Sequence, residues 1–118
     1  VNDTFGHLAG DAVLRNVARV FGGGMRPEDV VARYGGEEFV VVLRGIPLQE
    51  AAVVAERLRR EVEASVVDFE GQPIRVTSSA GVACSNEFQS ADKVALLGAA
   101  DGRLYKAKSS GRNRVVAY

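Results

Sequence analysis

The sequence predicts an α+β domain in which helices pack against an antiparallel-rich sheet. Three observations predict this class. Apolar residues recur at helical spacing in three segments, two hairpins separate those segments, and a short apolar strand closes the chain. The predicted order is therefore helix, hairpin, helix, hairpin, helix, strand. The 118 residues contain no internal repeat, low-complexity segment or linker, so we expect one domain over residues 1–118.

The first helix and the first hairpin are predicted between Asp11 and residue 43. From Asp11 the apolar residues recur at helical spacing, and the glycines at 22–24 end the helix. Residues 30–32 and 39–43 are predicted as short buried strands, joined by the loop at residues 35–38. The apolar stripe of the helix is Val13, Leu14, Val17, Val20 and Phe21.

The second helix opens at Pro47, a residue type that is favoured in the first turn of a helix. A second hairpin follows, with a turn at Glu70 and Gly71 and an alternating, half-buried strand over residues 74–82. The inward residues of the helix are Ala51, Val54, Ala55, Leu58 and Val62, and its solvated face is Glu56, Arg57, Arg59, Arg60 and Glu61.

The third helix is predicted over residues 90–108, and a short strand over residues 115–117 ends the chain. Gly111 follows the helix directly, so we expect it to form a left-handed cap. The apolar stripe of this helix is Val94, Leu97, Ala100, Leu104 and Ala107.

Composition excludes several classes of function. Fifteen basic and fifteen acidic residues cancel, which argues against a broad surface for nucleic acid or for an anionic membrane. No apolar run approaches the ~18 residues of a membrane span. The single cysteine, Cys84, lies in a strand pattern and is predicted to be a buried thiol in a reducing compartment, which favours the cytoplasm.

The loop Gly35-Gly36-Glu37-Glu38 contains two acidic side chains that a hairpin turn does not require. Two glycines alone satisfy the turn, so the two carboxylates are the surplus. A pair of acids beside bare glycine backbone suits a divalent metal and a phosphate that arrive together. A solvated turn is the other interpretation of the same residues.

Two further pairs allow a structural and a functional interpretation. Asp11 could be a helix-start acid that the macrodipole stabilises, or Asn2 and Asp11 together could bind the amide and amine edge of guanine. Lys108 and Arg112 could complement the dipole at a helix end, or they could clamp a phosphate chain.

These residues together resemble the GGDEF domain in its Glu-containing form. The match begins with Gly35, Gly36, Glu37, Glu38 and Phe39, and it covers essentially the whole chain. The other matching segments, in order and spacing, are residues 2–11, 76–83 and 100–113. GGDEF domains are diguanylate cyclases, which condense two GTP into cyclic di-GMP with release of two pyrophosphates. The resemblance implies a nucleotide-cyclase or palm-like (ferredoxin-like) antiparallel-rich sheet flanked by helices.

The resemblance also implies a role for each matching residue. Glu37 and Glu38 would be catalytic, with Glu37 as ligand of Mg²⁺ or Mn²⁺ and Glu38 as support for the metal and the attacking 3'-hydroxyl. The remaining residues would bind GTP: Asn2 and Asp11 the guanine, Gly35 and Gly36 the nucleotide through bare backbone, and Lys108 and Arg112 the terminal phosphates. Each domain would bind one GTP, so the active form would be a homodimer.

The resemblance implies an inhibitory site as well. Arg26 and Asp29 stand where the family places its motif for binding cyclic di-GMP, and Arg57 is a candidate partner from the next helix. A catalytically idle receptor for cyclic di-GMP, or a GTP-binding regulatory domain, is therefore the alternative function. The cyclase domain would be cytoplasmic and could belong to a membrane-anchored sensor of a bacterium.

The chain departs from the family pattern at two places. The family has a strand before Asn2 that carries an Asp metal ligand, so we expect an N-terminal truncation and no cyclase activity from the 118 residues alone. Gly102 and Arg103 replace a small or apolar pair, which weakens helix propensity there.

Overall fold

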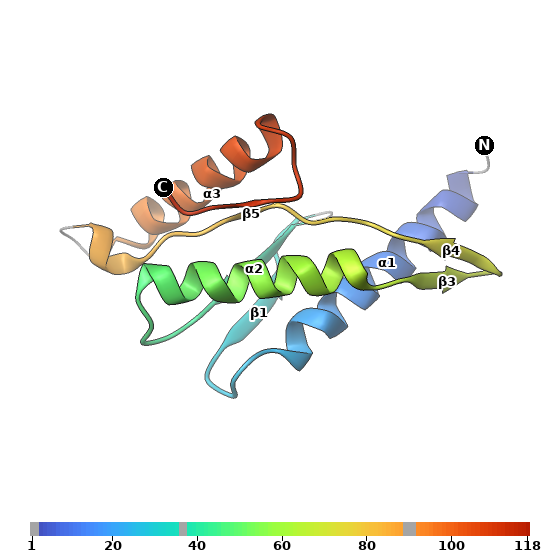
Figure 1. Ribbon diagram of the computed structural model, residues 1–118, viewed down its shortest axis with the longest axis horizontal. Coiled ribbons are helices and arrows are strands. Elements are labelled where there is room, and N and C mark those ends of the chain that lie inside the picture. The colour runs from blue at the N-terminus through green and yellow to red at the C-terminus, as the bar shows by residue number, and fades with distance from the viewer. Residues whose placement is uncertain (1–2, 36–37, 89–91) are drawn as a thin grey trace. The chain divides into compact units, whose positions relative to one another are not determined.

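The computed structural model describes residues 3–35, 38–88 and 92–118 and confirms the α+β class (Figure 1). Two compact units make up the chain: Val1–Arg44 with Glu61–Val76, and Gly45–Arg60 with Thr77–Tyr118. Of the strand pairings in the described residues, two are antiparallel and one is parallel. None of the helices described is both long and apolar enough to cross a membrane.

In the first unit, α1 (Asp3–Gly23) begins eight residues before the predicted start at Asp11. The prediction was wrong because Gly6 and Gly10 suggested an irregular segment. Each glycine costs a helix roughly 1 kcal/mol, but elongation of an existing helix adds a hydrogen bond with every residue. Asp11 consequently lies in the interior of α1, beyond the first turn where the macrodipole acts. The predicted end, at the glycine run, is confirmed.

The first hairpin agrees with the sequence prediction to within one residue at each end. β1 (Val30–Arg33) pairs antiparallel with β2 (Phe39–Val42), in a register that places Arg33 opposite Phe39. The predicted burial was wrong for β1, because most of its residues are exposed. The ring of Phe39 packs edge-on against Phe21 of α1, with centroids 5.5 Å apart.

The second hairpin, also in the first unit, pairs β3 (Val67–Phe69) with β4 (Gln72–Ile74) and lies against α1 through β3 (Figure 1). Its predicted turn is confirmed: Glu70 and Gly71 have φ of 52° and 81°, the left-handed pair of a two-residue hairpin turn. Nearby, the buried Asn16 donates from Nδ2 to Ser65 Oγ at 3.0 Å, so this polar side chain is satisfied.

The strand predicted over residues 74–82 is two strands. Ile74 ends β4, whereas β5 (Ala80–Gly81) pairs parallel with β6 (Val115–Val116) in the second unit. The alternating pattern is continuous, but a strand also needs a neighbour for its backbone groups. The hydrogen-bonding partner changes from β3 to β6 along this segment.

α2 (Leu48–Ala64) follows Pro47 as predicted, and Leu58 and Val62 are buried. The prediction of a solvated charged face was wrong for Arg59. Only 14% of the Arg59 side chain is exposed, against 73% for Arg60 one residue later.

α3 (Lys93–Ser109) begins after Asp92, whose side chain accepts from the Val94 amide at 2.9 Å. The predicted first residue, at position 90, lies outside the described residues. Ala107 is buried as predicted, but Val94 and Leu97 are exposed, so the predicted stripe was wrong at its N-terminal end. α3 contacts β5 and β6, and a Cβ on Gly81 would collide with backbone atoms of Ala100 and Leu104.

Candidate functional site

The loop between β1 and β2 is closed by its own backbone. The amides of Tyr34 and Gly35 both donate to the Glu38 carbonyl, at 2.8 and 3.4 Å. Arg33 Nε donates to the Gly35 carbonyl at 3.2 Å, so the last residue of β1 also supports the loop. Gly36 and Glu37 lie outside the described residues. The hydrogen bonds hold the backbone of Glu38 directly before the first residue of β2.

The residues of the predicted metal and guanine sites are described only in part. Glu38 and Asp11 are half-buried and belong to the first unit, whereas Glu37 and Asn2 lie outside the described residues. Carboxylate oxygens are the ligands that Mg²⁺ prefers, so the chemistry of Glu38 fits a divalent metal. In the described ranges no three His, Cys, Asp or Glu side chains form a group that could hold a metal ion.

Arg26 and Asp29 form a hydrogen-bonded ion pair on the loop before β1. Arg26 Nη2 and Nε donate to the two carboxylate oxygens of Asp29 at 3.0 and 3.3 Å, and the Arg26 amide donates to the same carboxylate at 2.9 Å. The Arg26 hydrogen bonds hold the pKa of Asp29 below its ordinary value. Arg26 Nη2 also donates to the Arg44 carbonyl at 2.7 Å, and Nη1 lies 3.4 Å from Glu28. The predicted inhibitory pair is therefore held together in the structure.

Lys108 and Arg112 flank the turn that ends α3, in the second unit. Gly111 has φ of 128°, which confirms the predicted left-handed residue after the helix. The Arg112 amide reaches back to the Ala107 carbonyl at 2.9 Å, the bond expected of a Schellman cap. Lys108 is half-buried and Arg112 is exposed.

Arg57, the proposed partner of Arg26, is exposed on α2 in the second unit, whereas Arg26 belongs to the first.

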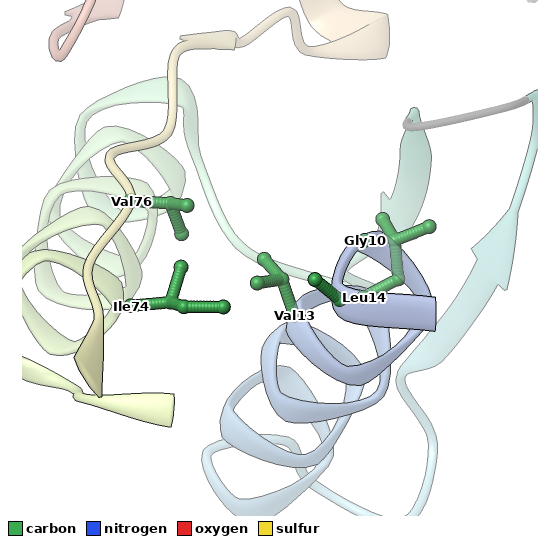
Figure 2. A pocket seen from close by; sticks show the side chains of 6 residues that line it. Gly10, Val13, Leu14, Ile74 and Val76 are labelled. Carbon is green, nitrogen blue, oxygen red and sulfur yellow. The ribbon is translucent and has the colours of Figure 1, made fainter. Parts of the chain in front are cut away.

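A pocket of about 330 Å³ lies in the first unit (Figure 2). Val13 and Leu14 of α1 line one side, and Ile74 and Val76 line the other. Gly10, immediately before Asp11, is also part of the lining. Every lining residue is apolar, and a nucleotide site needs polar groups that orient the ligand. We therefore assign no ligand to this pocket.

Sequence reasoning missed the roles of two arginines. Arg103 donates to both oxygens of Glu87 at 2.8 and 2.9 Å and to the Val82 carbonyl at 2.7 Å, although the sequence indicated only a weakened helix there. The Glu87 carboxylate also accepts from the Cys84 amide. Arg59 binds Asn113, which is 54 residues away in the sequence. No local pattern signals contacts between residues so far apart.

The thiol of Cys84 is half-buried, so the prediction of a buried thiol was wrong.

Comparison with known proteins places the chain in a family. The sequence profile described as "Diguanylate cyclase, GGDEF domain" matches residues 1–114. Diguanylate cyclase A of Treponema denticola is 44% identical over 115 residues, which are 98% of this chain and 31% of that protein. The response regulator PleD of Caulobacter vibrioides is 44% identical over 119 residues, covering 98% of this chain and 26% of PleD. The chain thus spans about a third or less of the length of these relatives.

Solved structures agree. The GGDEF domain of DgcB from Caulobacter crescentus, crystallised in complex with c-di-GMP, superposes with a TM-score of 0.85 at 36% identity, over 98% of this chain and 68% of that one. The active GGEEF domain of a diguanylate cyclase from Vibrio cholerae gives a TM-score of 0.81 at 32% identity, over 100% of this chain and 74% of that one. This chain therefore belongs to the GGDEF family of diguanylate cyclase domains.

Proposed function

We propose that residues 1–118 are one domain that, within the full-length protein, condenses two GTP into cyclic di-GMP and releases two pyrophosphates. The observation that carries the proposal is the hydrogen-bonded loop between β1 and β2, which presents Glu38 directly after the glycines and Glu37. Because the cyclic product contains two bonds, each formed between two nucleotides, two GTP sites must face each other. The active form is then a homodimer.

Each residue has one task in this proposal. Asn2 and Asp11 hydrogen-bond the guanine edge, whose amide and amine protons suit an acceptor such as a carboxylate. Gly35 and Gly36 let the phosphates approach the loop backbone. Lys108 and Arg112 neutralise charge on the terminal phosphates, and in phosphoryl transfer such positioning and charge stabilisation provide most of the catalysis.

In this proposal Glu37 ligates Mg²⁺ or Mn²⁺, and Glu38 supports the metal and the attacking 3'-hydroxyl. The bound metal would polarise the oxygens of the transferred phosphoryl group. The free thiol of Cys84 fits a reducing compartment, so the domain would work in the cytoplasm. Arg26 and Asp29 bind the product and slow the enzyme when cyclic di-GMP accumulates. Arg57 is the weaker member of this inhibitory site.

The test uses the full-length protein with GTP and Mg²⁺, compared with Glu37→Ala and with Glu28→Gln as a surface control. We expect cyclic di-GMP from the parent and from the control, and none from Glu37→Ala. Binding of cyclic di-GMP without turnover by the parent would instead support a receptor. Full turnover by Glu37→Ala would refute the assigned metal ligand.

A further inference from the structure

The turn after α3 has an unusual backbone. Gly111, Arg112 and Asn113 are consecutive, and their φ angles are 128°, 63° and 51°. Glycine adopts positive φ readily, but Arg112 is a long side chain in a region that L-residues rarely occupy. A conformation of this kind persists only where surrounding contacts determine it. The contacts around the turn must therefore stabilise the positive φ of Arg112.

Backbone and side-chain bonds hold the turn from several directions. The Asn113 amide donates to Ser79 Oγ at 3.0 Å, and Arg114 Nε donates to the Arg112 carbonyl at 3.0 Å. From α2, Arg59 Nη1 donates to the side-chain oxygen of Asn113 at 2.7 Å. Together with the Arg112 amide bond to Ala107, these contacts restrain the residues on both sides of the Arg112 side chain.

A second interaction, with Glu56, orients the guanidinium of Arg59. Its Nε and Nη2 donate to the two oxygens of Glu56 at 2.8 and 2.7 Å, in the fork geometry that makes arginine–carboxylate pairs specific. The hydrogen bond from Arg59 is the main cause that lowers the pKa of Glu56 to about 2, so this carboxylate is charged at neutral pH. The guanidinium thus connects α2 to the turn with one orientation.

The Arg112 side chain is exposed and, within the described part of the chain, makes no hydrogen bond or ion pair. The network restrains the Arg112 backbone and leaves its guanidinium available. We infer that Arg59 is a positioning residue, which acts through Asn113 to hold Arg112 where it meets the terminal phosphates of a nucleoside triphosphate. This inference rests on the proposed phosphate role of Arg112.

The test measures binding of two probes to the full-length protein: GMP, and a GTP analogue with a methylene bridge between the α and β phosphorus atoms. Arg59→Ala should weaken binding of the analogue about ten-fold, or about 1.4 kcal/mol, and leave GMP binding unchanged because GMP lacks the terminal phosphates. Arg60→Ala is the matched control, because Arg60 binds the same Glu56 and makes no hydrogen bond to Asn113 in the described residues. The control should bind both probes as the parent does.

A double-mutant cycle separates the inference from the proposal beneath it. If Arg59 acts through Arg112, then Arg59→Ala should have no further effect on analogue binding in an Arg112→Ala background. Asn113→Gly, which tolerates positive φ but removes the acceptor, should reproduce Arg59→Ala and serves as its substitute if that variant misfolds. Unchanged analogue binding by Arg112→Ala would overturn the phosphate role itself. If Arg112→Ala weakens binding but Arg59→Ala does not, or Arg59→Ala weakens GMP binding equally, only the positioning role is overturned.

Discussion

Arg59 Nη1 lies 2.7 Å from the side-chain oxygen of Asn113, and this bond joins the middle of α2 to the turn after α3. The same guanidinium binds both oxygens of Glu56 one turn earlier in α2. A residue that the charge pattern placed on a solvated face thus connects two segments of the second unit. We therefore expect the stability of that unit to depend on the charge state of Glu56.

Stability should fall in acid as Glu56 loses its charge. Its pKa is lowered from 4.5 to about 2 in the folded protein, so its contribution is complete above pH 4.5 and is lost as the pH falls toward 2. Because the Glu56 side chain is 36% exposed, solvent screening limits the effect to about 0.5–1 kcal/mol. Denaturant unfolding followed by circular dichroism, for the parent and Glu56→Gln, measures the difference. A difference that stays constant from pH 7 to pH 2 would contradict the ion pair.

Gly81→Ala should destabilise the domain by about 3 kcal/mol, because the new Cβ meets the backbone of Ala100 and Leu104, which cannot rotate away as a side chain can. Gly102→Ala is the control on α3. A Cβ there meets nothing within 4 Å, so we expect it to stabilise the helix by about 0.5–1 kcal/mol. The two midpoints of thermal unfolding should move in opposite directions. Equal midpoints would show that α3 does not pack closely on β5.

Arg26→Ala should weaken inhibition by cyclic di-GMP about ten-fold or more, because each hydrogen bond to a charged group contributes roughly 1.5–3 kcal/mol. The measurement is the inhibition constant, referred to the uninhibited rate of the same variant. Glu28→Gln removes only the 3.4 Å contact and keeps the Arg26–Asp29 bonds, so its inhibition constant should match the parent. Unchanged inhibition of an active Arg26→Ala enzyme would show that this pair does not bind the product.

Removal of divalent metal should abolish turnover. We expect EDTA to stop formation of cyclic di-GMP by the full-length protein, and excess Mg²⁺ or Mn²⁺ to restore it, because Glu37 and Glu38 offer carboxylate oxygens for hard cations. Turnover that survives complete chelation would exclude the metal from the mechanism.

Local patterns in the sequence were sufficient for the elements that local rules control. The glycine run after Phe21, Pro47 before α2 and the Glu70–Gly71 turn act through their own backbone preferences, and each was predicted at the observed position. The start of α1 was missed because helix elongation passed over Gly6 and Gly10. The division of the 74–82 strand was missed because its two partners, β3 and β6, are set by the tertiary fold.

The sequence predicted the residues of the candidate site from their side-chain types and from the family resemblance. Arg26 and Asp29 were assigned to a site through the family resemblance, and the hydrogen bonds between their side chains were not predicted. The hydrogen bonds made by Arg59 and Arg103 could not be predicted from local patterns. Arg59 binds Asn113, 54 residues away, and Arg103 binds Glu87, 16 residues away. Burial on α3 was also beyond the pattern, since Val94 and Leu97 fit the helical stripe yet are exposed.

The most direct test of the account is the ratio of products from GTP. The full-length protein, incubated with GTP and Mg²⁺, should release two pyrophosphates for each cyclic di-GMP, since each of two GTP molecules loses one. Both signals should disappear together in Glu37→Ala. Release of inorganic phosphate without cyclic dinucleotide, or no reaction of GTP with the folded dimer, would contradict the proposal that this domain is an active diguanylate cyclase.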